Sequence, residues 1–478
     1  MEATTQIKPN SAWDMIKAYF LDFKVLKDCP VEFWTIQVIN FLDCTAYFAF
    51  LNIATVFLSE TIGFSDVRAG YVFTVFTVTV TLMLFFSGFV TDSLGIKNSM
   101  YLAMALLLIT RGGIALCGFF PGIPHRQAAM WVLLFLLAPG TAMVQTIFQA
   151  AIRRYTSKRA RSAGFNMWYL IMNIGAALGG FSIDFVRLSL KWDNTWIINI
   201  GVFGAVLCTI FTFLFIRREL QVRSPGEEPD PEEEKPAERK MPWQILTEVV
   251  TQSAFWRFLV LVSCVIGVRA VFLYMALLMP KYWLRVMGEQ APIGLFQAIN
   301  PIIIVVGLIL FIPLSNKFNI YKMLVFGGFI SSFSLFALVL PWRWVSADIV
   351  VGYTVLTYIQ LIILSVGEII WSPKLQEYTA AVAPHGQEGS YLGMSLMPYF
   401  IAKTFIGLLS GHMLVRFCPV GIQPQILAGT LPFWRTPEAM WFLLGAFAVF
   451  GLVMALVFKG WLTAGVKLDP VREVEAVA

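Results

Sequence analysis

Several charged residues stand inside long apolar runs of this sequence, where a charge is costly. Four of them are Asp43 in the first run, Arg269 in "SCVIGVRAVFLYMALLMP", Glu368 in "LIILSVGEIIWSP" and Lys403 in "PYFIAKTFIGLLSG". A charged side chain at the centre of a bilayer costs roughly 2.5–3.5 kcal/mol on insertion scales. If these runs cross a membrane, such groups should line a wet cavity or pair with one another. The chemistry they indicate is reversible proton binding and recognition of a charged solute.

Asp43 belongs to a polar pattern in the first apolar run. Asn40, Asp43 and Tyr47 are spaced i, i+3 and i+7, and this spacing predicts that they share one helix face. We expect Asp43 to be a protonatable carboxylate that faces a cavity. The alternative interpretation is a structural ion pair between helices.

Arg269 lies deep in the seventh apolar run, which a repeat would relate to the first. We therefore expect Asp43 and Arg269 to pair when the site is unprotonated, since a cation beside a carboxylate favours its ionised form. Arg269 is also suited to binding an anionic group of a solute. Arg111, in the third run, is expected to make a contact between helices.

Glu368 shares its predicted helix face with Ser365. One interpretation is that Glu368 binds a cationic group of the solute or carries the proton, and the other is that it is neutral and bonded to a neighbouring helix. Lys403 is a candidate to balance Glu368 or to bind a carboxylate. Otherwise its long side chain extends to the membrane surface.

The composition places these residues in a membrane protein. The chain has 478 residues, 58% of them hydrophobic and 13% charged, whereas soluble domains have about 45–50% apolar and about 25% charged residues. The net charge of +6 comes from basic residues at the ends of apolar runs, so it does not indicate nucleic-acid binding. The six cysteines and three histidines are scattered without metal-ligand spacing, so no metal site is expected.

Twelve apolar runs approach the length of about 20 residues that a membrane span requires. The expected fold is an all-α membrane protein, with twelve transmembrane helices in two six-helix bundles. A segment rich in Pro, Glu and Lys separates the bundles and should be a solvated linker. The expected divisions are an amphipathic N-terminus (1–33), a first bundle (34–216), the linker (217–247), a second bundle (248–460) and a tail (461–478).

Lysine and arginine residues gather in the segments that lie on one side of such a membrane. By the positive-inside rule, both termini should be cytoplasmic. The chain has no Asn-x-Ser/Thr sequon, which agrees with a bacterial inner membrane. The first 30 residues lack the pattern of a cleavable signal peptide.

The two predicted bundles contain short segments that are similar in sequence. "GFVTDSLGIKNSM" (88–100) lies between the second and third runs, and "IPLSNKFNIYKML" (312–324) lies between the eighth and ninth. "RRYTSKRA" (153–160) and "QEYTAAVA" (376–383) follow the fourth and tenth runs at about the same offset. Two parallel repeats predict a solute site between the halves, near the middle of the membrane.

The twelve-span plan and the segment "GFVTDSLGIK" resemble the major facilitator superfamily. That family's loop motif is Gly-x-x-x-Asp-x-x-Gly-x-basic, and its positions are held here by Gly88, Asp92, Gly95 and Lys97. The resemblance implies a gating role for these four residues. Gly88 would permit close helix packing, Asp92 would pair with a cation or cap a helix, and Gly95 would permit a tight turn.

Several segments look like the proton-dependent oligopeptide transporter family within that superfamily. "FNMWYLIMNIGAALGG" (165–180) is similar to its fifth span, "QAINPIIIVVGLILFIPL" (297–314) to its eighth and "SVGEIIWSP" (365–373) to its tenth. The resemblance places Glu368 on the glutamate that recognises a peptide amino terminus.

The chain departs from that family's pattern in three spans. The first-span motif becomes "NFLDCTAYF" with Cys44 in place of the arginine, Gln145 replaces the fourth-span lysine, and the seventh span carries Arg269 instead of an acid. These departures weaken the expectation of peptide specificity. The expected proton-coupling residues are Asp43, Arg269 and Glu368, and the expected solute-binding residues are Asn40, Tyr47, Gln145, Asn173, Arg269, Asn300, Glu368 and Lys403.

The sequence offers no P-loop and no hydrolase or metalloprotease motif, so we expect neither ATP-driven transport nor an enzyme, and no cofactor. The favoured function is proton-coupled symport of a small peptide-like or other zwitterionic or charged organic solute by alternating access. An exporter of drugs or metabolites by proton antiport is the alternative, and a non-transporting membrane sensor is a third class. The expected partners are protons, the solute and lipid, with the chain as a monomer.

Overall fold

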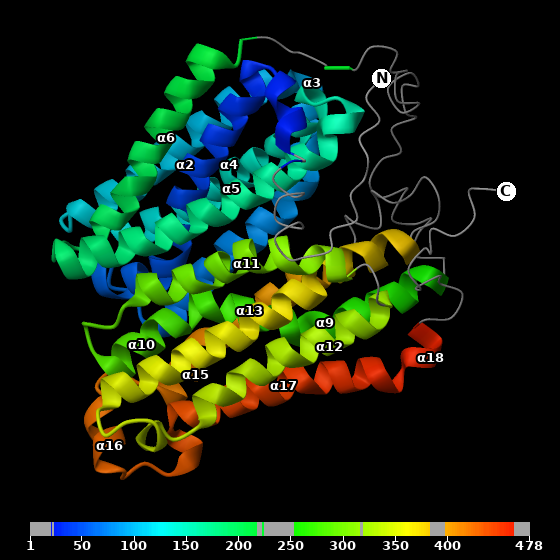
Figure 1. The fold of residues 1–478 in the computed structure, drawn as a ribbon. Helices are drawn as coiled ribbons and strands as arrows, with labels where there is room; N and C mark the ends of the chain where they lie inside the picture. The colour runs from blue at the N-terminus through cyan, green and yellow to red at the C-terminus, as the bar shows by residue number, and fades with distance from the viewer. Residues whose placement is uncertain are drawn as a thin grey trace.

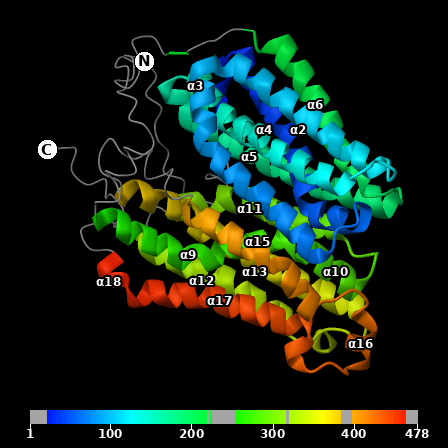
Figure 2. The ribbon, with the colours of Figure 1, turned by 180° about the vertical axis from the view of Figure 1, so that it is seen from behind.

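The computed structural model describes residues 21, 23–217, 222–223, 253–315, 319–382 and 397–462, and the regular structure of these residues is helical. The helices form two bundles that lie against each other with their axes running roughly the same way (Figures 1 and 2). Residues 1–20, most of the expected linker at 217–247 and the tail from 463 lie outside the described residues.

The first bundle contains six membrane-crossing segments from five helices. α3 holds two of them, because Gly95 adopts a left-handed φ of 76° and turns the chain within one continuous element. This conformation agrees with the tight turn expected at Gly95, since glycine reaches positive φ without steric cost. The elements are η1 (Phe23–Asp28), α2 (Val31–Val56), η2 (Phe57–Thr61), α3 (Asp66–Phe119), α4 (Arg126–Tyr155), α5 (Lys158–Asp184), η3 (Phe185–Ser189) and α6 (Thr195–Phe215).

The second bundle repeats this plan with six long helices and several short ones. The short helix α10 lies at the end of the molecule opposite α18, as Figure 1 shows. The elements are α9 (Ser253–Leu277), α10 (Met279–Met287), α11 (Ile293–Ser315), α12 (Ile320–Phe333), η4 (Ser334–Val339), η5 (Trp342–Trp344), α13 (Ile349–Val382), α15 (Met397–Phe417), α16 (Gln423–Ala428), η6 (Phe433–Arg435), α17 (Pro437–Val457) and α18 (Lys459–Leu462).

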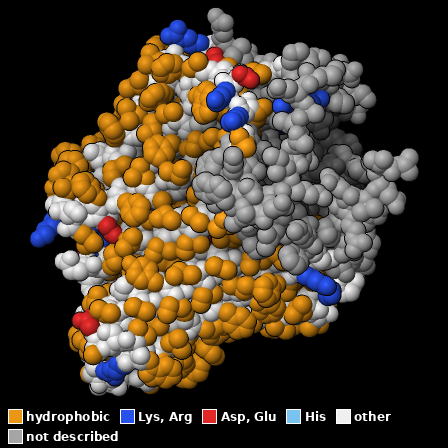
Figure 3. All heavy atoms as spheres, viewed as in Figure 1, with side chains coloured by type: hydrophobic (Ala, Val, Ile, Leu, Met, Phe, Trp, Pro, Cys, Tyr) orange, Lys and Arg blue, Asp and Glu red, His pale blue; other side chains and the backbone are white. Residues whose placement is uncertain are grey.

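The helices have the length and polarity of membrane spans. Eleven segments in the described part of the chain are long and apolar enough to cross a bilayer, and α11 adds a shorter apolar stretch at Ile293–Gly307. Figure 3 shows apolar side chains covering the visible flank of both bundles, with few charged groups, most of them near helix ends. The fold is therefore the expected all-α membrane protein with a twelve-helix plan.

Two pairs of helices carry most of the contact between the bundles. α3 packs against α15, and α5 packs against α11. Both pairs approach closely at glycine: a Cβ added to Gly407 would collide with Thr74, and one added to Gly294 would collide with the carbonyl of Gly180. Small residues allow helix backbones to approach in a membrane, where lipid offers no hydrophobic drive for association.

Candidate functional site

A cavity of about 340 Å³ lies between the two bundles. Its walls come from α2, α3 and α5 on one side and from α9, α11, α13 and α15 on the other. This volume is at the lower end of the range that small-molecule pockets occupy. The expected site residues that line it are Tyr47, Asn173, Arg269, Asn300, Glu368 and Lys403.

Glu368 holds a polar cluster at the wall formed by the second bundle. The Asn300 amide Nδ2 lies 2.8 Å from Glu368 Oε2 and 3.0 Å from Ser365 Oγ, so it donates toward both oxygens. Ser365 donates in turn to the carbonyl of Leu361 at 2.7 Å. The carboxyl group therefore accepts from a neutral amide on α11, while its side chain lines the cavity.

Arg269 lies on α9 and lines the same cavity. Its guanidinium carbon is 5.4 Å from the centroid of the Trp371 ring, a cation–π contact that orients the planar group. An oriented guanidinium suits a carboxylate, which it can bind through two parallel hydrogen bonds.

Lys403 reaches from α15 to the other bundle. Its Nζ donates to Thr81 Oγ1 on α3 at 3.0 Å, and Thr81 donates to the carbonyl of Thr77 at 3.0 Å. The alternative, in which the Lys403 side chain extends to the membrane surface, is therefore wrong. Its ammonium instead joins the two bundles beside the cavity.

The wall formed by the first bundle is neutral among the described residues. Its polar groups are Tyr47 and Asn52 on α2, Thr77 on α3, and Tyr169 and Asn173 on α5. These groups offer hydrogen bonds without charge.

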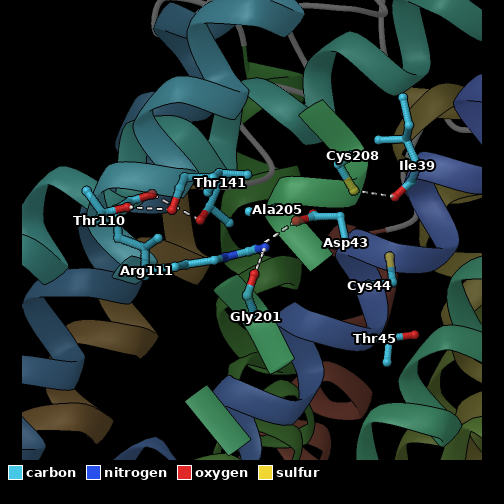
Figure 4. A network of polar contacts seen from close by, with 12 residues as sticks. Ile39, Asp43, Cys44, Thr45, Thr110, Arg111, Thr141, Gly201, Ala205 and Cys208 are labelled. Carbon is cyan, nitrogen blue, oxygen red and sulfur yellow. Dashed lines mark hydrogen bonds and ion pairs between the residues drawn. The ribbon is translucent and has the colours of Figure 1, made fainter. Parts of the chain in front are cut away.

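Asp43 does not line the cavity and does not pair with Arg269. Its Oδ1 accepts from Arg111 Nη2 at 2.7 Å, and Arg111 Nη1 donates to the carbonyl of Gly201 at 3.4 Å (Figure 4). Both side chains are buried, with exposed fractions of 9% and 8%. The pairing expected between Asp43 and Arg269 is wrong, and the alternative of an ion pair between helices describes Asp43. The contact expected for Arg111 is confirmed.

Asn40, Asp43 and Tyr47 were expected to share one helix face, but each of them meets a different part of the molecule. The Asn40 amide donates to the carbonyl of Trp168 on α5 at 3.0 Å, Asp43 turns to α3, and Tyr47 reaches the cavity. Three residues of α-helix leave about 60° between side chains, enough to send Asp43 to a different partner. Gln145 was also expected at the solute site, but it lies on α4, which contributes no residue to the cavity.

A second charged cluster joins the bundles at the α10 end of the molecule. Asp66, the first residue of α3, accepts from Lys281 Nζ at 2.8 Å and from Arg285 Nη2 at 2.7 Å, both on α10. Lys281 also donates to Ser59 Oγ at 2.5 Å. Burial lowers the pKa of the Lys281 ammonium, although the charge of Asp66 opposes this shift. We refer to Ser59, Asp66, Lys281 and Arg285 as the α10 cluster.

Asp184, at the end of α5, joins the two bundles at the same end by accepting hydrogen bonds from backbone amides. Its two carboxylate oxygens accept from the amides of Gly294 and Leu295 at 2.8 and 2.7 Å, at the N-terminus of α11. Free amides and the helix dipole at such a terminus favour an anion. Tyr71 and His412 add a hydrogen bond of 3.0 Å between α3 and α15. The two bundles are thus joined by charged and polar contacts at the α10 end.

The loop motif lies at the turn within α3. A Cβ built at Gly88 would meet no atom of the described residues within 4 Å, so the close packing expected there is not seen in the described part of the chain. The side chain of Asp92 lies outside the described side chains. The gating role of Gly88, Asp92, Gly95 and Lys97 stays a prediction.

Several residues of these sites were not expected from the sequence. Thr77 and Thr81 are spaced i and i+4 in an apolar run, a pattern that could have been read as a polar stripe. Asp66, Lys281 and Arg285 sit near the ends of apolar runs, where charges are ordinary, so no sequence signal distinguished them. Asn300, in contrast, was expected and provides the bond that holds Glu368.

The fold and the cavity between two six-helix bundles define a membrane transporter. A model of the Major Facilitator Superfamily matches residues 34–407, and the chain belongs to this superfamily. It is therefore a transporter and not an enzyme. Within the superfamily it resembles, distantly, the POT family of peptide transporters.

Curated relatives match over part of their length. A hexuronate transporter of Bacillus subtilis (strain 168) is 20% identical over 184 residues, which cover 38% of this chain and 40% of the relative. A dipeptide and tripeptide permease A of Citrobacter koseri is 24% identical over 204 residues, which cover 42% of this chain and 38% of the relative. The chain thus spans less than half the length of each relative it matches.

Solved structures match over nearly the whole chain. A crystal structure of a peptide transporter POT in complex with sulfate has a TM-score of 0.67 at 15% identity, covering 92% of this chain and 98% of that one. The POT family transporter PepTSo has a TM-score of 0.68 at 15% identity, covering 91% and 99%. At this identity the likeness establishes the fold.

Proposed function

We propose that this transporter is a proton-coupled symporter of a small peptide-like or other zwitterionic or charged organic solute. The observation that carries the proposal is the cavity between the bundles, lined by Glu368, Arg269 and Lys403. Charged side chains at membrane depth are costly to keep, and they mark solute and proton pathways. Side chains of both signs in one cavity suit a solute that carries charge.

The relatives support a polar organic solute and leave its scaffold open. One relative is named for hexuronates and another for dipeptides and tripeptides. The solutes in these names share a small polar skeleton with a carboxylate group. A carboxylate therefore belongs among the groups that the cavity should accept.

Glu368 is the proposed proton carrier. It lines the cavity, and its bond from the Asn300 amide is available to the ionised form and to the protonated form through the carboxyl oxygens. A proton moving down a potential of 100 mV releases about 2.3 kcal/mol, which is sufficient to drive accumulation of a solute.

The contacts at the α10 end support alternating access. The α10 cluster, Asp184 and the Tyr71–His412 pair hold the bundles together there, so the solute path at this end is closed. Opening this end requires the ion pairs between bundles to break. We propose that the bundles rock about the cavity and exchange these contacts for others at the opposite end, where the motif from Gly88 to Lys97 lies.

Uptake into proteoliposomes tests this proposal. Labelled dialanine and labelled glucuronate are supplied outside, with the lumen made alkaline by an imposed pH gradient. We expect at least one of the two solutes to accumulate, and a protonophore to abolish the accumulation. Absence of gradient-driven accumulation of both solutes would contradict the proposal.

Export by proton antiport is the second candidate, and the apolar part of the cavity wall favours it. Phe48, Phe73 and Phe272 line the cavity together with leucine and methionine side chains. Aromatic walls suit lipophilic solutes. Gradient-driven export of a lipophilic cation such as tetraphenylphosphonium, without uptake of dialanine or glucuronate, would favour this candidate.

We further propose that the protein works as a monomer in a bacterial inner membrane with both termini in the cytoplasm. The gathering of lysine and arginine on one side of the predicted spans supports this orientation. Labelling of cysteines added at each terminus, in intact cells and in permeabilised cells, tests it.

A further inference from the structure

Among the described residues, the charged groups at the cavity come from one bundle. Arg269 on α9, Glu368 on α13 and Lys403 on α15 all belong to the second bundle. The polar groups that the first bundle contributes are hydroxyls and amides, among the described lining residues. The two walls therefore differ in chemistry: one recognises charge, and the other offers neutral hydrogen bonds.

The described lining carries more positive than negative charge. Arg269 and Lys403 supply two cations, and Glu368 supplies one carboxylate. The lining is thus positive by one charge when Glu368 is ionised and by two when it is protonated. Both cations line the same cavity.

Other carboxylates of the described residues do not offset this excess, because they serve contacts elsewhere. Asp43 is paired with Arg111 inside the first bundle, 2.7 Å away. Asp66 is bonded to Lys281 and Arg285 at the α10 end. Asp184 accepts from backbone amides of α11 at that same end.

Resting on the function proposed above, we propose that the cavity selects solutes of net negative charge and that Arg269 and Lys403 bind their acidic group. The Arg269 guanidinium, oriented by Trp371, offers a planar pair of donors to a carboxylate. Lys403 adds a second donor from α15, and its bond to Thr81 exchanges for a bond to the solute. A solute with an ammonium group places it at Glu368, but this group is dispensable.

The order of these preferences follows from the charge count. Removing the acidic group from a solute leaves both cations facing a neutral or cationic ligand, so binding should be lost. Removing the ammonium group leaves Glu368 with its Asn300 bond, so binding should persist. A cavity built for zwitterions would instead lose affinity in both cases.

Matched probes separate these outcomes. Dialanine is the zwitterion, N-acetyl-dialanine is the anion and dialaninamide is the cation of one scaffold. Glucuronate and glucuronamide form an acid and neutral pair on a sugar scaffold. Binding of each probe to the purified full chain is measured by titration calorimetry at one pH, and transport of each bound probe is measured in proteoliposomes.

For each scaffold that binds, we expect the acid form to bind at least tenfold more tightly than its amide. N-acetyl-dialanine, which lacks the ammonium group, should still bind. Arg269→Gln and Lys403→Gln should each reduce this preference, while Arg269→Lys, which keeps the charge, should preserve it in part. Arg68→Gln removes the same charge from an exposed position outside the cavity and is the matched control. It should leave the preference unchanged.

Two failures can be told apart. An amide form that binds as well as its acid, or better, would overturn the charge selection while leaving the proposed transport function standing. Absence of binding and transport for every probe, acid or amide, would overturn both the proposed function and the selection. Loss of folding in a glutamine variant leaves the wild-type comparison of acid with amide as a complete test.

Discussion

Two buried carboxylates, Asp43 and Glu368, lie inside apolar helices of opposite bundles and meet different partners. Asp43 faces a guanidinium at 2.7 Å, within its own bundle. Glu368 faces a neutral amide at 2.8 Å and lines the cavity between bundles. The first carboxylate is paired with a permanent cation inside one bundle, whereas the second is bonded to a neutral amide beside the cavity. The partner, more than the residue type, assigns the role.

The largest effect should come from Glu368→Gln. The amide keeps the size and hydrogen bonds of the side chain but cannot carry a proton. We expect gradient-driven uptake to fall by at least about 100-fold, which corresponds to about 2.7 kcal/mol. Exchange of labelled for unlabelled solute across the membrane should persist. Uptake at the wild-type rate in this variant would show that Glu368 takes no part in proton coupling. It would also contradict the difference in role between Glu368 and Asp43.

Asp43→Asn should act on stability instead. It leaves the Arg111 charge buried without its carboxylate, and breaking a buried pair in this way costs about 3–5 kcal/mol. Unfolding of the detergent-solubilised protein, followed by tryptophan fluorescence, measures this loss.

The double variant Asp43→Asn/Arg111→Gln supplies the control for that measurement. It removes the stranded charge together with the carboxylate, and part of the stability should return. The protein that remains folded should retain gradient-driven uptake. A stable Asp43→Asn protein without gradient dependence would show that Asp43 carries the proton, as first expected.

Asp66→Asn sharpens the comparison with a third carboxylate, whose ion pairs join the two bundles. Without this anion, Lys281 and Arg285 lose their shared partner across the bundles. We expect the α10 end to open. The equilibrium between its closed and open states should shift toward the open state by about tenfold, or about 1.4 kcal/mol.

Distances between spin labels on Ile123 and Val420 report this opening, since the two positions belong to different bundles. Asp43→Asn, whose ion pair lies within one bundle, should leave the distances unchanged. An unchanged distance distribution in the Asp66→Asn variant would show that the α10 cluster does not hold this end closed.

The smallest effect should be a dependence of the same distances on alkaline pH. Burial lowers the pKa of Lys281, which lies outside the membrane-spanning segments, and opening would return it toward the ordinary lysine value of about 10.4. The closed state thus binds this proton more weakly than the open state. Raising the pH between the two pKa values should favour the closed state, by less than about threefold, or about 0.7 kcal/mol. Lys281→Arg should abolish this dependence, and a shift toward the open state would contradict the assignment.

The sequence predicted the helices and the cavity better than it predicted the pairings. Length and hydropathy determine a membrane span, so the twelve-helix plan could be read directly from the chain. Glu368, Arg269 and Lys403 stood out because a charge in an apolar run is rare, and all three line the cavity. Gly95 was identified by its motif and adopts the expected turn conformation.

Pairings between distant helices could not be read in this way. We expected Asp43 to pair with Arg269, but its partner is Arg111. Periodicity gives the face of a helix without showing which helix covers that face. Asp66 and Arg285 are separated by 219 positions and lie at helix ends, where charges are common. Only the packing of the two bundles brings them together.

The central claim is that the proton and the solute meet in one cavity through Glu368. Titration calorimetry of a bound solute, such as N-acetyl-dialanine, in buffers of different ionisation enthalpy counts the protons taken up on binding. At a pH where free Glu368 is largely ionised, the account predicts uptake of close to one proton per solute in the wild type and in the Arg68→Gln control, and none in Glu368→Gln. Proton uptake that survives Glu368→Gln would contradict it.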